Sequence, residues 1–164
     1  MSEPVIFEEK VYSKWTTVLF IALTVVCSTL AIWRIASHGL DFLGSLATIL
    51  AVMFLFYVLN YQTLVIHLTP QSLALKFGLF SYKIPLENIQ DCQLDDPPWF
   101  YKYGGAGIHF YLLRGRYRAS FNFLEFPRVA ISLRQKAGLV KEISFTTRQP
   151  DKIIQLIQQV RSQV

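Results

Sequence analysis

The chain has 164 residues, of which 52% are hydrophobic and 16% are charged, and its mean hydropathy is +0.35. A composition this apolar excludes an intrinsically disordered protein and is unusual for a domain that lies wholly in water. The formal net charge is +5 at pH 7, and the two cysteines are too few for a disulfide framework. The positions of the apolar residues therefore decide the class of protein.

Two segments account for the excess of apolar residues. Residues 15–33 and residues 42–61 contain no Asp, Glu, Lys, Arg or His. As helices they would each be roughly 28–30 Å long, which is the thickness of the hydrocarbon core of a bilayer. We predict that they are two transmembrane helices, joined by a short connection into a helical hairpin over residues 15–61.

The charges around this hairpin predict its orientation. Lys10 and Lys14 precede the first span, whereas the connection between the spans has one arginine, Arg34, which Asp41 balances. Thirteen Lys and Arg against seven Asp and Glu follow the second span. Because basic residues near a membrane favour the cytoplasmic side, we predict a cytoplasmic segment over residues 1–14 and both termini in the cytoplasm.

An ionisable residue inside a span is the usual sign of a proton relay or an ion pathway. Neither span contains one. We therefore interpret the hairpin as an anchor. Aromatic residues lie at or near the ends of the spans, as is typical of the interface between membrane and water. The first span is also unlike a cleaved secretory signal, because glutamates precede it and no small-residue cleavage motif follows.

Residues 62–164 are long enough for one compact domain. Residues 63–68 and 73–77 flank the turn Thr69-Pro70-Gln71-Ser72 and predict a β-hairpin. After Pro150 the apolar residues follow the period of a helix, with polar residues on the other face, so the chain ends in an amphipathic helix. The remaining strands are expected at about 79–84, 89–94, 108–113, 117–123, 129–133 and 142–146.

This order of elements predicts an α+β membrane protein. Seven or eight short antiparallel strands would form a β-barrel or sandwich, and the C-terminal helix would cover one open end of it. That arrangement is the one found in PH-like domains.

Several short motifs carry a resemblance to bacterial PH-like membrane proteins, in which such a domain follows a two-helix hairpin. They are Leu68-Thr69 with Leu73, Ile84-Pro85-Leu86 with Ile89, the stretch from Tyr103 to Ile108, and Pro150. The resemblance covers residues 15–164. The chain departs from the family pattern at Ala106, where an aromatic residue is frequent, and at His109, where an arginine is frequent.

The resemblance implies a non-enzymatic interaction or scaffold module that docks a protein partner or a membrane complex at the cytoplasmic face. The expected location is a bacterial plasma (inner) membrane or another energy-transducing membrane. An alternative is an assembly factor or accessory subunit of a photosynthetic or respiratory complex, because a photosystem I assembly factor is similar in architecture. Binding of anionic lipid headgroups is a further alternative.

The most unusual stretch of the later domain follows Asp95 and Asp96. Two prolines stiffen it, and it contains four aromatic side chains, Trp99, Phe100, Tyr101 and Tyr103. Aromatic side chains are common at protein interfaces, so these four are candidates for binding a partner. The alternatives are a structural lid over the core of the domain and insertion into the bilayer.

Three arginines alternate with other residues around Gly115. In an extended strand Arg114, Arg116 and Arg118 would lie on one side, where guanidinium groups can hold anionic headgroups. These three residues are the candidates for lipid binding. The alternative is a solvated hairpin tip with Gly115 at the turn.

The remaining classes of function have no supporting pattern. The glycines at 104–107 lack the spacing of a phosphate-binding loop, and no nucleophile has a recognisable base at a dyad spacing. The cysteines, histidines and acidic residues lack the spacing of zinc or calcium sites. We therefore predict no catalytic residue, no cofactor, no metal, no small-molecule substrate and no nucleic-acid partner.

Overall fold

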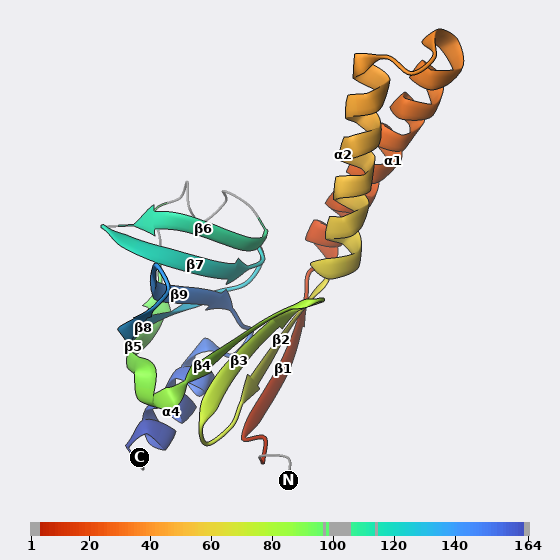
Figure 1. Ribbon diagram of the computed structural model, residues 1–164. Helices are drawn as coiled ribbons and strands as arrows, with labels where there is room; N and C mark the ends of the chain where they lie inside the picture. Colours follow the sequence, from red (N-terminus) through yellow and green to blue (C-terminus); the bar gives the residue numbers. More distant parts are fainter. Residues whose placement is uncertain (1–3, 97, 99–105, 114, 163–164) are drawn as a thin grey trace. The chain divides into compact units, whose positions relative to one another are not determined.

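The computed structural model describes residues 4–96, 98, 106–113 and 115–162, and it divides into two units (Figure 1). One unit is the helical segment at residues 13–62. The other unit contains the described residues on both sides of that segment. The described residues before the helical segment, which were predicted to form a separate segment, therefore belong to the β domain.

The helical unit consists of α1 (Lys14–His38) and α2 (Phe42–Asn60), packed against each other along their length (Figure 1). Both helices are long and apolar enough to cross a membrane. Their lengths correspond to about 37 Å and 28 Å at the usual rise of a helix. The buried residues of α2 include Gly44, Ala47 and Ala51, whose small side chains allow helices to approach closely.

Side-chain caps begin both helices. Ser13 Oγ accepts a hydrogen bond from the backbone N–H of Thr16 at 3.0 Å, and Asp41 Oδ1 accepts one from the N–H of Gly44 at 2.7 Å. The other carboxylate oxygen of Asp41 forms an ion pair with Arg34. The connection between the helices is therefore shorter than predicted, because α1 continues past Arg34 to His38.

The first sheet has four antiparallel strands in the order of the chain. They are β1 (Phe7–Tyr12), β2 (Thr63–Leu68), β3 (Ser72–Phe77) and β4 (Phe80–Pro85). The hairpin of β2 and β3 and the strand β4 confirm the expected elements. Strand β1 was not predicted, because the buried Glu9 interrupts the apolar alternation of Phe7 and Val11.

The side chain of Glu9 is hydrogen-bonded to the segment just before the last helix. Its carboxylate accepts a hydrogen bond from the backbone N–H of Arg148 at 2.9 Å and another from the hydroxyl of Thr147. A guanidinium N–H of Arg148 in turn donates to the carbonyl of Tyr12 at 3.3 Å. These contacts connect β1 to the C-terminal part of the domain.

The second sheet has five strands in the order β5-β8-β9-β7-β6. A short 3-10 helix, η1 (Leu86–Asn88), leads from β4 into β5. The strands are β5 (Ile89–Asp95), β6 (Gly107–Leu113), β7 (Arg116–Asn122), β8 (Arg128–Ala137) and β9 (Val140–Thr146).

Two details of the predicted fold are wrong. The described residues form nine strands instead of seven or eight, and β7 pairs with β9 in parallel. The parallel pair arises because β8 does not pair with β7 directly. Strand β9 follows β8 in the chain and lies between β8 and β7 in the sheet. It is antiparallel to β8 and parallel to β7.

Aromatic and aliphatic side chains fill the space between the sheets. Phe77 of the first sheet lies 6.4 Å from Phe121 and 5.2 Å from Phe123, measured between ring centroids. The helix α4 (Pro150–Arg161) contacts β5 and β8 and buries Ile153 and Ile157. This confirms the amphipathic C-terminal helix that the periodicity after Pro150 predicts.

Candidate functional site

The second sheet has one apolar and one polar face. Along β7, Ala119 and Phe121 face the core, while Arg118, Ser120 and Asn122 alternate with them. The polar side chains are nonetheless buried, with exposed fractions of 7% for Arg118 and 1% for Ser120. Buried polar groups need partners, and this face supplies them.

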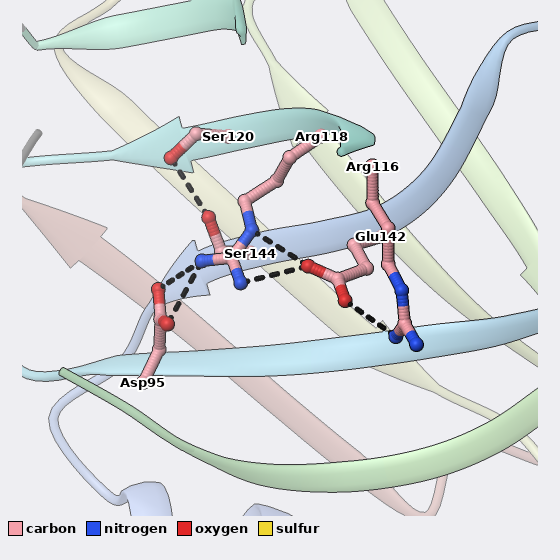
Figure 2. A network of polar contacts seen from close by, with 6 residues as sticks. All are labelled: Asp95, Arg116, Arg118, Ser120, Glu142 and Ser144. Carbon is pink, nitrogen blue, oxygen red and sulfur yellow. Dashed lines mark hydrogen bonds and ion pairs between the residues drawn. The ribbon is translucent and has the colours of Figure 1, made fainter. Parts of the chain in front are cut away.

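Arg118 is the centre of a network of charged side chains, which Figure 2 shows. Its Nη1 donates to both carboxylate oxygens of Asp95 at 2.8 Å, and its Nη2 donates to Glu142 Oε2 at 2.8 Å. Its Nε also donates to Glu142 Oε2, at 3.1 Å. Arg116 Nη1 donates to the other oxygen of Glu142 at 3.0 Å. Each carboxylate therefore has at least one guanidinium partner.

The network joins strands that are not neighbours. Arg118 lies on β7 and Glu142 directly opposite on β9, whereas Asp95 is the last residue of β5, on the far side of β8. The side chains of Arg118, Asp95 and Glu142 are only 8%, 8% and 12% exposed. Such a buried pair stabilises only when both charges are present, because a lone buried charge is costly.

The same contacts shift the protonation equilibria. Burial lowers the pKa of the Arg118 guanidinium, but the hydrogen bonds and charges of Asp95 and Glu142 outweigh burial and leave the pKa raised. Burial raises the pKa of Glu142, and the hydrogen bonds from Arg118 and Arg116 lower it by more, so its net pKa falls. Both groups are therefore charged near neutral pH.

Uncharged polar residues continue the network along β7 and β9. The hydroxyl of Ser144 donates to Ser120 Oγ at 2.9 Å, between residues that are direct partners in the parallel register (Figure 2). On β6, His109 Nε2 lies 2.9 Å from the backbone oxygen of Ala106. Burial lowers the pKa of His109 despite this hydrogen bond, which favours a neutral imidazole at pH 7.

The predicted arginine cluster is thus partly assembled. Arg116 and Arg118 lie on the same side of β7 and share Glu142, as expected for alternate residues of a strand. Gly115 has a φ of 76° between β6 and β7, which fits the hairpin turn predicted there. Arg114 lies outside the described residues. The carboxylates that pair with the arginines were not identified from the sequence.

The four aromatic candidates Trp99, Phe100, Tyr101 and Tyr103 also lie outside the described residues. Other exposed apolar side chains lie on β6, which pairs only with β7 among the strands that the structure describes. Phe110 and Leu112 on β6 are 64% and 56% exposed, and Tyr117 opposite Leu112 is 43% exposed. The alternation of these residues predicted a strand, but nothing in it indicated that this side would be uncovered.

A depression of about 500 Å³ lies beside η1. Its described lining has one basic and one acidic side chain, Lys83 and Glu87, so it has no clear preference for an anion or a cation. Within the described part of the chain, no group of three or more His, Cys, Asp or Glu side chains is arranged as a metal site would require.

The sequence of the chain matches the model of a known family. Residues 16–140 match the family model of the bacterial PH domain, and the match runs from α1 to the beginning of β9. Because the match covers well over half of the chain, the chain belongs to the bacterial PH domain family, as its short motifs indicated. No curated protein and no solved structure matches it.

Proposed function

We propose that the protein is a non-enzymatic interaction module held in a membrane by α1 and α2. The β domain lies at the cytoplasmic face in this proposal and docks a protein partner or a membrane complex. A role as an assembly factor or accessory subunit of a photosynthetic or respiratory complex is a narrower form of the same function.

The observation that carries the proposal is the apolar side of β6. Phe110 and Leu112 are more than half exposed, and they lie on a strand with one unpaired edge among the described residues. An edge strand with exposed apolar side chains can pair with a partner and bury them in the same contact. The aromatic residue Tyr117 lies beside them on β7.

The anionic-lipid alternative has less support. A phosphate would have to compete with Asp95 and Glu142 for Arg118, whose side chain is only 8% exposed. Arg116 is more accessible, but it also has Glu142 as a partner. The arginines on this face are paired with carboxylates, which favours a structural role for them over anion binding.

The test uses the tagged full-length chain, purified from its own membranes in a mild detergent. The associated subunits are identified by mass spectrometry for the wild type, for a Phe110→Ser/Leu112→Ser variant and for Leu139→Ser. Leu139 is the matched control, because it is 74% exposed and lies in the turn between β8 and β9.

We expect one set of subunits with the wild type and with Leu139→Ser, and a several-fold loss of that set with the β6 variant. Each variant is checked for an unchanged circular dichroism spectrum. Equal recovery of the subunits with the β6 variant would contradict docking at this strand. A wild-type chain that purifies alone would contradict the interaction function as a whole.

A further inference from the structure

The apolar helices are inserted between two neighbouring strands of the first sheet. Tyr12, the last residue of β1, is the direct partner of Thr63, the first residue of β2. Only Ser13 separates β1 from α1, and only residues 61–62 separate α2 from β2. The chain therefore leaves the β domain toward the helices, and returns from them, at one end of this sheet.

The turn between β3 and β4 lies at that same end. Leu64, one residue after Thr63, is the partner of Phe77, and Phe77 is the partner of Phe80. Gly78 and Leu79 form the turn beyond them, with a φ of 49° at Gly78. The turn between β2 and β3 lies at the opposite end, because Leu68 pairs with Leu73.

The two turns differ in polarity. The turn between β2 and β3 is Thr69-Pro70-Gln71-Ser72, in which the Thr69 hydroxyl is hydrogen-bonded to Ser72. The turn at the other end presents Leu79, which is 81% exposed, and Phe80, which is 44% exposed. Leu79 has the largest exposed fraction of the exposed large hydrophobic residues in the described chain. The apolar turn is the one beside the connections to the helices.

The register also limits how far this turn is from those connections. With about 4.8 Å between strands and about 3.3 Å per residue, Leu79 lies within roughly 10–15 Å of Thr63. The headgroup region on each side of a bilayer is about 5–8 Å thick, as the difference between the total and the hydrocarbon thickness shows. A turn this close to the connections can reach the region where apolar and aromatic side chains enter the membrane surface.

We propose that the turn between β3 and β4 is a third membrane contact, with Leu79 and Phe80 at the boundary between the headgroups and the acyl chains. The proposal rests on the membrane anchor proposed above. Together with the two connections, this contact limits rotation of the β domain relative to the bilayer. Lys76, which is exposed near the end of β3, adds a positive charge beside the turn for anionic headgroups.

The test uses the full-length chain in nanodiscs of phosphatidylethanolamine and phosphatidylglycerol, with and without nitroxide-labelled lipids as quenchers. A polarity-sensitive fluorophore is attached to single cysteines in a Cys27→Ser background. The native Cys92 stays unlabelled, because its thiol is 3% exposed and burial, followed by the charge of Asp91, raises its pKa to about 12.

Three labelled positions separate the turn from the anchor. Leu79→Cys reports on the proposed contact, and Gln71→Cys, in the exposed turn at the other end of the same strand, is its control. Leu55→Cys in α2 reports on the membrane anchor. We expect several-fold stronger quenching at position 79 than at position 71 by nitroxides near the headgroups, and quenching at position 55 by nitroxides deep in the bilayer.

A second comparison places the label outside Leu79 and Phe80, so that these two residues can be compared in their native and substituted forms. The fluorophore is placed at Ser81→Cys, and Leu79→Glu/Phe80→Glu is then added, which we expect to reduce its quenching several-fold. Quenching at position 55 without quenching at positions 79 and 81 overturns the third contact alone. A lack of quenching at position 55 as well overturns the membrane anchor on which this contact depends.

Discussion

At the level of single residues, Arg118 links parts of the second sheet that backbone pairing does not join. Its guanidinium has five N–H groups in a planar fork, and this geometry allows it to serve two carboxylates at once. Asp95 and Glu142 occupy both sides of the fork. The same residue type in an exposed turn would indicate anion binding, so burial and partners decide its role here.

Replacement of Arg118 tests that role. We expect Arg118→Ala to lower the free energy of unfolding by about 3–5 kcal/mol, because it leaves two largely buried carboxylates without their main partner. Arg116→Ala, which removes an exposed partner of Glu142, should cost less than about 1 kcal/mol. Thermal unfolding of the full-length chain in detergent measures the loss of stability for each variant. Equal losses for the two substitutions would argue against a structural role of Arg118 in linking the strands.

At the level of elements, β1 shows how a long insertion can leave a fold intact. Tyr12 and Thr63 are direct partners in β1 and β2. The helices α1 and α2 therefore replace the short turn that would join these two strands in an ordinary β-hairpin. The connections are short on both sides. The two apolar helices therefore extend from a loop of the β domain, while β1 still completes the first sheet.

This arrangement predicts that the two apolar helices can be removed without unfolding the β domain. Replacing residues 13–62 with Asn-Gly should give a water-soluble, folded β domain, because a two-residue turn of that sequence joins antiparallel strands at such a register. The matched control deletes residues 1–62 and so lacks β1. We expect a cooperative thermal transition only for the first variant, measured by circular dichroism, and an equally stable control would show that β1 is dispensable.

The elements that sequence patterns predicted are those with a local signal. The two apolar helices, the hairpin of β2 and β3 and the amphipathic α4 each follow from the spacing of apolar residues within one segment. Strand β1 was missed because Glu9 occupies a buried position, which is stable only through the distant backbone of Arg148. The carboxylate partners of Arg118 were missed for a related reason, since Asp95 and Glu142 are more than twenty residues away in the chain.

At the level of the whole molecule, an apolar hairpin and a β domain are joined within one chain of the bacterial PH domain family. The apolar residues of the hairpin explain the high mean hydropathy, and the basic residues lie mainly in the β domain. Positive charge beside apolar helices favours the cytoplasmic side. The proposed orientation therefore places the connection between α1 and α2 on the outer side of the membrane.

Labelling of single cysteines tests this orientation. In a Cys27→Ser background, Leu40→Cys in the connection should react with a membrane-impermeant maleimide added to intact spheroplasts. Leu139→Cys in the β domain should react only after permeabilisation, and the two positions are similarly exposed, at 79% and 74%. The reverse pattern of labelling would show that the β domain lies outside.

Local patterns in the chain were sufficient to define the apolar helices, most of the strands and the C-terminal helix, because these depend on residues close together in the sequence. The place of β1 in the first sheet and the parallel pairing of β7 with β9 depend on contacts between distant segments. The free energy of such contacts comes from burial and register across the folded domain, so no single segment encodes it. The same applies to the network of Arg118, because Arg116 and Arg118, two of the arginines that suggested an anion site, are paired with carboxylates from two other strands.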